Sequence, residues 1–297
     1  MRSLCLFVVA GILAMSAARA AGQNLAKQVP ADPKGEVDIT NVAGTVEVTG
    51  WDRPSVDVQG SYDSGVQRVD VLTQGSHTIV KVVPAPRFIM HDTEARLRIQ
   101  VPSASAIEVN AVSSDFRGVG LSGPQRLKTV SGDVQTTIGS GDLDVKTISG
   151  NVSLRGGENS ANLRIQTVSG DVTIEHGAGS LEAITVSGGV SAQLAPAKTV
   201  RVRSTSGNLK FDGRLTADAT LDAETISGDL AIGGGSENGF QYDVSTFNGD
   251  IHSCFRTESS GGHKGALPGS TLNGAVGQGG ARVRLKTMNG DVSLCDR

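Results

Sequence analysis

A six-residue phrase, TVSGDV, stands at residues 129–134 and returns unchanged at residues 167–172. Related phrases keep its glycine in the same place: TISGNV from Thr147, TVSGGV from Thr185, STSGNL from Ser204, TISGDL from Thr225, TFNGDI from Thr246 and TMNGDV from Thr287. Successive glycines are 18 to 21 residues apart, except for a final gap of 41. A fixed period of about twenty residues is the signature of a solenoid, in which equal units stack on one another.

Each repeat is predicted to contain two strands. Apolar residues alternate before the phrase, as at Leu143 and Val145, and after it, as at Val152 and Leu154. Alternation with a period of two residues is typical of strands with one buried face. Composition agrees, since 39 glycines and only 3% aromatic residues suit short strands joined by tight turns.

The phrase itself is predicted to be a corner. Thr167 and Val168 are adjacent and both recur, so we expect the chain to bend between them. Glycine permits a positive φ, and the Asp or Asn beside it suits a turn. The predicted corner residues are structural: Gly132, Asp133, Gly150, Asn151, Gly170, Asp171, Gly188, Gly207, Asn208, Gly228, Asp229, Gly249, Asp250, Gly290 and Asp291.

Stacking such units buries their apolar faces and pairs each strand with its equivalents above and below. The sequence therefore predicts an all-β chain whose residues 111–297 form a right-handed parallel β-helix, or β-solenoid. The handedness follows from the usual preference of parallel crossovers. Residues 35–110 are predicted to form an N-terminal all-β region that caps the solenoid. Residues 21–34 are expected to be a flexible lead.

The first twenty residues have the pattern of a secretory signal peptide. Arg2 precedes an apolar run, and Ala18–Ala20 forms a small-x-small cleavage site. We expect export to the periplasm, with the cell surface or the extracellular space as alternatives, and no transmembrane segment after cleavage. Removing Arg2 and Arg19 leaves 25 basic against 30 acidic residues, so nucleic acid is not an expected partner.

Cys254 and Cys295 occupy the same place in their repeats, five residues after a phrase glycine. An even pair of cysteines in an exported chain favours a disulfide. Since neighbouring strands lie about 4.8 Å apart, the bond requires adjacent coils. The long final gap is therefore predicted to contain one coil and a looped-out insertion at residues 258–280.

The chain resembles a family of bacterial envelope proteins known as putative adhesins. The resemblance rests on the opening DITNVAGTVEVTGWD, on LRIQVP, and on the ladder of T-[VI]-SG-[DN]-V phrases, and it covers residues 35–297. It implies a β-solenoid fold and an exported location. It brings no catalytic residues.

Sequence chemistry offers weak alternatives to a structural role. The row of corner Asp and Asn residues could gather calcium, but the glycine-rich nonapeptide of calcium-binding β-rolls is absent, so turn chemistry is favoured. Glu182 and Glu224 are the carboxylates that could serve a carbohydrate-active enzyme, and solvated surface charge is the simpler explanation. Trp51 is expected in the core of the cap rather than against a sugar. No cofactor and no metal site are predicted.

The sequence predicts an exported, non-enzymatic β-solenoid with a structural, adhesive or scaffolding role in the bacterial envelope. Its expected partner is an envelope protein or glycan, and its oligomeric state is left open. Two alternatives remain: a polysaccharide lyase or hydrolase on the same scaffold, and a periplasmic partner or sensor in an envelope-stress system.

Overall fold

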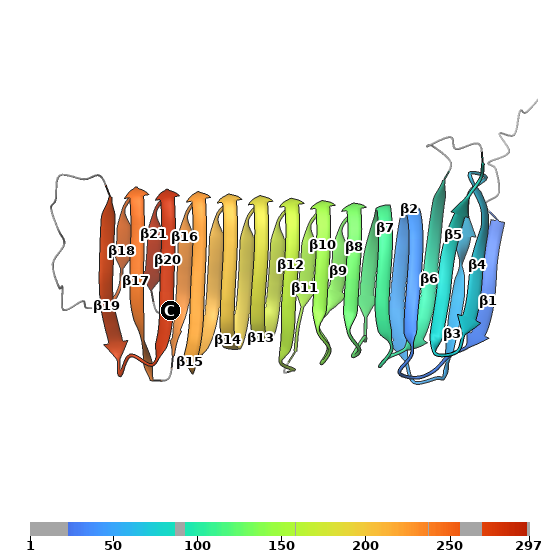
Figure 1. Cartoon of the computed structure of the whole chain (residues 1–297), viewed down its shortest axis with the longest axis horizontal. Coiled ribbons are helices and arrows are strands. Elements are labelled where there is room, and N and C mark those ends of the chain that lie inside the picture. Colours follow the sequence, from blue (N-terminus) through green and yellow to red (C-terminus); the bar gives the residue numbers. More distant parts are fainter. Residues whose placement is uncertain (1–22, 87–92, 158, 237, 256–268, 296–297) are drawn as a thin grey trace, which may run out of the picture.

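The computed structural model describes residues 23–86, 93–157, 159–236, 238–255 and 269–295. Its regular structure is all β, and the strands are stacked side by side in one elongated rack (Figure 1). No helix with the length and hydropathy of a membrane span occurs in the described part of the chain. The predicted signal peptide, residues 1–20, lies outside the described residues.

The N-terminal strands are β1 (Gln23–Pro30), β2 (Glu36–Trp51), β3 (Ser55–Tyr62), β4 (Val66–Gln74), β5 (His77–Pro84), β6 (Glu94–Pro102) and β7 (Ala106–Val119). The middle strands are β8 (Gln125–Ser131), β9 (Val134–Thr137), β10 (Leu143–Ser149), β11 (Val152–Arg155), β12 (Ala161–Ser169), β13 (Val172–Ser187) and β14 (Val190–Ser206). The last strands are β15 (Leu209–Ser227), β16 (Leu230–Ser236), β17 (Gly239–Asn248), β18 (Ile251–Ser253), β19 (Ser270–Gly277), β20 (Ala281–Asn289) and β21 (Val292–Cys295).

The predicted stacking of equivalent residues is confirmed in the middle of the rack. Strand β10 pairs in parallel with β8 and β12, and β11 pairs in parallel with β9 and β13. Val152 lies between Val134 and Val172 in this register. Each repeat therefore forms one coil, with a longer strand before the corner and a shorter one after it.

The core is a set of aliphatic columns. In one coil Leu143, Val145, Val152 and Leu154 are all at most 1% exposed, and their equivalents in neighbouring coils are buried above and below them. Threonine occupies the last inward position before the corner and is also buried, as at Thr147. A single continuous apolar cluster runs from one end of the rack to the other. Its length compensates for the small amount of apolar area that one coil can bury.

The corners lie at the predicted glycines, but the bend expected between Thr and Val does not occur. Thr167 is buried, Val168 is exposed, and β12 continues through both to Ser169, so alternation persists up to the glycine. Gly170 has φ of +129° and its amide donates to the carbonyl of Ser187 in the next coil, 3.2 Å away. A Cβ on Gly170 would collide with the backbone carbonyl oxygen of Gly150 in the previous coil.

The Asp and Asn beside the glycines bond to the next coil. Asp133 Oδ1 accepts from the amide of Asn151 at 2.8 Å, and Asn151 Oδ1 accepts from the amide of Asp171 at 3.0 Å. The chain of contacts continues from Asp171 to the amide of Gly189 at 2.7 Å. Either residue type serves, because both present an oxygen at the same place. These contacts give the predicted corner residues a structural task.

The C-terminal coils are not stacked in chain order. The coil formed by β20 and β21 lies between the coil of β15 and β16 and the coil of β17 and β18, and pairs in parallel with both. The disulfide between Cys254 and Cys295 is present, with Cα atoms 4.8 Å apart. The adjacency of the two cysteines was predicted, but the final coil of the sequence is the penultimate coil in space.

The predicted insertion at residues 258–280 is not wholly looped out. Within it, β19 pairs antiparallel with β17 and forms the outer edge of the rack, while residues 256–268 lie outside the described ranges. A strand there satisfies backbone groups of β17 that would otherwise face solvent.

The N-terminal end has a related arrangement. The long strand β2 near the start of the chain pairs in parallel with β7 on one side and with β5 and β6 on the other. Antiparallel pairing of β3 with β6, β4 with β5 and β1 with β3 completes this end. The prediction of a flexible lead at residues 21–34 is wrong for β1, whose strand continues the sheet. The proposed boundary at residue 110 falls inside β7, and the sheet as a whole is mixed rather than purely parallel.

The corner glycines yield a stability prediction. Gly170→Ala places a Cβ against the Gly150 backbone at a φ that L-residues rarely adopt, so we expect it to lower the free energy of unfolding by about 2–4 kcal/mol. Urea unfolding followed by circular dichroism measures this loss. Gly157→Ala is the matched control, because nothing lies within 4 Å of its added Cβ. Equal midpoints for the two variants would contradict the role of the corner.

The disulfide yields a second prediction. It closes a separation of 41 residues, so Cys254→Ser with Cys295→Ser should lower the free energy of unfolding by about 2–4 kcal/mol. A thiol reductant should bring the wild-type midpoint down to that of the double variant. The reductant should leave the double variant unchanged, and a shift there would mean that the loss has another origin.

Candidate functional site

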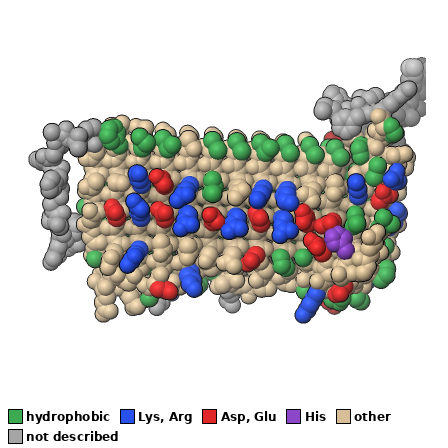
Figure 2. Space-filling model, in the orientation of Figure 1, with side chains coloured by type: hydrophobic (Ala, Val, Ile, Leu, Met, Phe, Trp, Pro, Cys, Tyr) green, Lys and Arg blue, Asp and Glu red, His purple; other side chains and the backbone are tan. Residues whose placement is uncertain are grey.

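The outward residues before each corner form straight rows across one broad side of the rack. We call this side the charged face, and its central row the charge ladder. In spatial order the ladder consists of Asp38, Glu108, Arg126, Asp144, Arg164, Glu182, Arg201, Asp222, Arg284 and Asp243. Figure 2 shows acidic and basic side chains in rows along this face.

From Glu108 onward the ladder alternates in sign at every step. Opposite charges on adjacent strands stabilise a sheet, whereas like charges directly opposite destabilise it. Two steps have close ion pairs: Arg126 Nη1 lies 3.3 Å from Glu108 Oε2, and Arg164 Nε lies 3.0 Å from Glu182 Oε2. The step from Asp38 to Glu108 breaks the alternation, because both residues are acidic.

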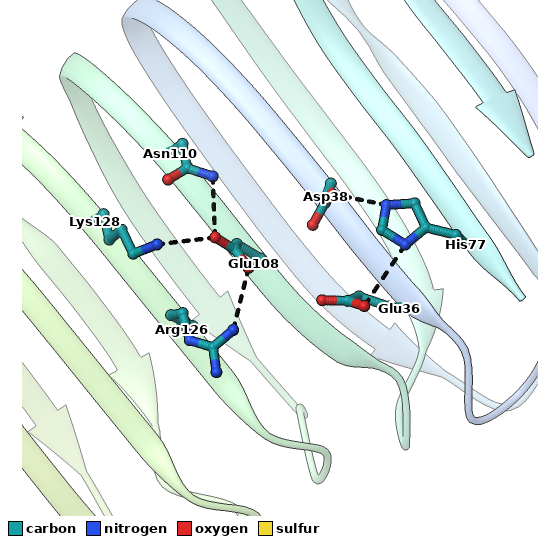
Figure 3. A network of polar contacts seen from close by, with 7 residues as sticks. All are labelled: Glu36, Asp38, His77, Glu108, Asn110, Arg126 and Lys128. Atoms are coloured by element: carbon teal, nitrogen blue, oxygen red, sulfur yellow. Dashed lines mark hydrogen bonds and ion pairs between the residues drawn. The ribbon is translucent and has the colours of Figure 1, made fainter.

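Glu108 is the most strongly held carboxylate of the ladder. Lys128 Nζ donates to Glu108 Oε1 at 3.0 Å, and Asn110 Nδ2 donates to the same oxygen at 3.4 Å (Figure 3). The hydrogen bond from Lys128, helped by Asn110 and Arg126, lowers the pKa of Glu108 below its ordinary value, against the opposing effect of partial burial. The cations thus keep Glu108 charged next to Asp38.

An acidic cluster lies at this end of the ladder. Carboxylate oxygens of Glu36, Asp38 and Glu108 all lie within 4.8 Å of one another. His77 reaches the cluster from β5, with Nε2 2.7 Å from Asp38 Oδ2 and Nδ1 3.6 Å from Glu36 Oε2 (Figure 3). Oxygen ligands of this kind suit a hard cation. Here they already contact His77, Lys128 and Arg126, so the geometry fits a polar network that joins the N-terminal strands to the stack.

An open groove runs along the charged face over β7 to β14. Its volume is about 690 Å³, and it is lined by ladder residues together with the row before them, which includes Asp142, Asn162, Ser180 and Thr199. Its lining combines side chains of both signs with strand residues between the two rows, such as Leu143, Leu163 and Leu181. Such a shallow, extended surface suits contact with a macromolecule better than enclosure of a small substrate.

A row of exposed aliphatic side chains forms the edge of the same face, and we call it the aliphatic ridge. Each occupies the second position of the repeated phrase and is 44% to 52% exposed. In spatial order the ridge consists of Val112, Val130, Ile148, Val168, Val186, Ile226, Met288 and Phe247, with Thr205 in one place. Figure 2 shows hydrophobic side chains in a line along the upper edge of this face. An exposed apolar row of this length is a candidate interaction surface.

The carboxylates weighed as catalytic candidates both lie on the charged face and both face cations. Glu182 pairs with Arg164, while Glu224 lies 4.0 Å from Arg203 and 3.8 Å from Lys286. They belong to different rows and to β13 and β15, which are not paired with one another. Trp51 is half-buried rather than enclosed in the cap core; its Nε1 donates to the carbonyl of Ser55, and Arg53 lies 5.1 Å above its ring.

The sequence did not single out the charge ladder, the aliphatic ridge or His77. The second position of the phrase was visible as a recurring hydrophobic residue, and its exposure follows from simple alternation after a buried threonine. The contact of His77 with Asp38 joins residues 39 positions apart in strands whose pairing no motif signals.

The environment of Glu108 predicts an acid-dependent loss of stability. Because its pKa is lowered by folding, its contribution is present above the pKa of the unfolded chain and is lost as the pH falls through the lowered value. Between about pH 6 and about pH 3, the urea midpoint of the wild type should fall further than that of Glu108→Gln. Glu94→Gln, at an exposed carboxylate, is the control and should behave as the wild type. Parallel pH curves for wild type and Glu108→Gln would contradict this account.

Comparisons with known proteins agree with the repeat and the all-β fold. The sequence profile of a family described as Toastrack DUF4097 matches residues 25–196 and again residues 97–295. No curated protein matches the chain. A putative adhesin from Parabacteroides distasonis is similar in structure, with a TM-score of 0.46 and 14% identity over 93% of this chain and 98% of that chain.

Two further solved structures are similar at lower TM-scores. A putative cell adhesion protein from Clostridium sporogenes is 9% identical over 93% of this chain and 100% of that chain, with a TM-score of 0.30. A putative lipid binding protein from Parabacteroides distasonis is 10% identical over 93% and 98% of the two chains, with a TM-score of 0.31. At these values the likeness decides nothing about function. The two profile matches together span nearly all of the described residues, and the chain belongs to the Toastrack DUF4097 family.

Proposed function

We propose that this protein is a non-enzymatic structural or adhesive scaffold of the bacterial envelope, and that the charged face with its aliphatic ridge is its contact surface. The observation that carries the proposal is the regularity of this face. A row of charge extends from β2 to β17 and a row of exposed apolar side chains from β7 to β17, in one register. A surface of this kind recognises a partner over a long line of contacts rather than at a single reactive centre.

The charges also indicate the class of partner. A nucleic acid needs an unbroken positive stripe, whereas the ladder alternates in sign. The candidate carboxylates Glu182 and Glu224 face arginine and lysine side chains, which disfavours acid–base chemistry at either. A protein or glycan of the envelope that presents both polar groups and an apolar edge fits the face.

Export to the periplasm is part of the proposal, with the cell surface as the alternative. It is supported by the signal-like pattern at residues 1–20 and by the disulfide, since such bonds persist in oxidising compartments. We further infer that the parallel coils wind as a right-handed β-helix, because parallel crossover connections have that hand in nearly all cases.

A capture experiment tests the contact surface. The disulfide-intact protein, immobilised and exposed to envelope extract, should retain a specific partner. Val130→Asn with Val168→Asn should reduce the captured amount about threefold to tenfold, because two half-exposed aliphatic contacts are lost. Val119→Asn is the matched control, since Val119 is 43% exposed but lies after the corner, on another side of the rack.

Circular dichroism and urea midpoints should show that the ridge variant and the control both keep the wild-type fold. Equal capture by the ridge variant and the control would contradict the assignment of the face. Turnover of an envelope polysaccharide by the purified protein would contradict the non-enzymatic role.

A further inference from the structure

The charge ladder has a symmetry that its contacts within one chain do not require. Between Glu108 and Arg284 it contains an even number of alternating charges. Read from the opposite end, every acidic place becomes basic and every basic place becomes acidic. A surface with this property is complementary to a reversed copy of itself.

Consider two copies packed face to face around a twofold axis that is parallel to the strands and passes between β12 and β13. Such an axis reverses the stack and keeps each row opposite the same row. The eight ladder residues from Glu108 to Arg284 then each meet an opposite charge of the second copy: Glu108 meets Arg284, Arg126 meets Asp222, Asp144 meets Arg201, and Arg164 meets Glu182. At the two ends of the ladder, Asp38 meets Asp243, which is a like-charge contact.

The same axis brings the aliphatic ridge of one copy against the aliphatic ridge of the other. Val168 meets Val186 of the second copy, Val130 meets Ile226, and Val112 meets Met288. Only Ile148 meets a polar residue, Thr205. One rotation therefore satisfies both features of the face, although they lie in different rows. A twofold axis along the stack and through the ladder would instead place each ladder residue against itself and oppose like charges.

We propose that the charged face binds a second copy of this chain in this antiparallel, face-to-face arrangement. The proposal rests on the assignment of this face as the contact surface and names its partner. Figure 1 shows the strands of the stack standing nearly parallel from β7 to β17, so the face is flat enough to meet its copy along most of its length.

Part of the ladder carries charge that the chain itself leaves without a close ion pair. Among the described residues, no oppositely charged side chain lies within 4.0 Å of Asp144, Arg201, Asp222 or Arg284. One oxygen of Asp144 is also without a hydrogen-bond partner in the described part of the chain. In the proposed dimer Arg201 of the second copy lies opposite Asp144, and Arg284 of the second copy lies opposite Glu108. The charged residues without a close ion pair in one chain thus gain partners of opposite sign.

The size of the face suits a stable dimer. Strands about 4.8 Å apart give a length of roughly 40 Å from β2 to β17, and four outward rows about 6.6 Å apart give a width of roughly 20 Å. The contact then buries roughly 800 Å² on each copy, the typical value for a specific complex. Two kinds of contact oppose it: Lys146 meets Arg203 of the second copy in the row next to the ladder, and Asp38 meets Asp243 at the ends of the ladder.

Charge reversal tests the arrangement in two ways: each single variant should weaken dimerisation, and a mixture of the two should recover it. Asp144→Arg and Arg201→Asp each create two like-charge contacts across the axis. Sedimentation velocity over a concentration series should show a wild-type dimer and a dissociation constant raised at least about tenfold in each variant. Lys210→Asp is the control for Arg201→Asp, because Lys210 is exposed after a corner, outside the charged face, and it should dimerise as the wild type.

Mixing the two variants gives the decisive result. In a mixed dimer the two reversed side chains face one another across the axis, and so do the native Arg201 and Asp144. These contacts are then complementary again, and the wild-type dissociation constant should return. Within one chain the two positions are three strands apart, roughly 14 Å, so contact inside a chain does not explain a rescue. Lys146→Glu should tighten the dimer at least about threefold, because it replaces the like-charge contact with Arg203 by an opposite-charge one.

A wild-type protein that stays monomeric, or a mixture that dimerises no better than its components, overturns this inference. If the ridge variant still loses an envelope partner in that case, the proposed function stands and only the identity of its partner is wrong. If the mixture rescues dimerisation but the ridge variant captures envelope partners as the wild type does, the second copy is the partner of the face and the heterologous partner binds elsewhere.

Discussion

Backbone pairing between successive coils is the constraint on which the rest of this structure depends. At the corners from Gly150 to Gly228 the amide of the glycine donates to the next coil, and the carbonyl of the preceding corner glycine occupies the place of a Cβ. The distance between strands leaves no room for a side chain there. The corner can therefore fall at only one residue of the repeat, and that residue sets the register of every strand that follows.

Because the register is fixed, the residues at one position of the repeat lie in a straight row along the stack. Inward positions become aliphatic columns, which supply the stability of the rack, and outward positions become rows with one environment from end to end. The charge ladder and the aliphatic ridge are two such rows. Because their residues sit on paired strands rather than on loops, their spacing is as regular as the sheet itself, which makes a long repeated contact with a partner feasible.

The sequence was sufficient to place equivalent residues of the repeat on top of one another, although the bend that it suggested between Thr167 and Val168 does not occur. Alternation around Val152 predicted its place between Val134 and Val172, and equal offsets from the glycines predicted that Cys254 and Cys295 lie together. It was not sufficient for the order of the coils, because similar repeats can pair equally well with several neighbours. The ladder was missed for this reason. In chain order Asp222 is followed by Asp243, and only the placement of Arg284 between them makes the signs alternate.

The position of the last coil has a consequence for biosynthesis. Residues 239–253 leave the ribosome before residues 281–295, yet the later segment lies between them and the stack. The edge of β15 must therefore stay open, or be vacated, until residues 281–295 arrive. The order of docking therefore differs from the order of synthesis, and the bond between Cys254 and Cys295 can form only after both of these coils have been made.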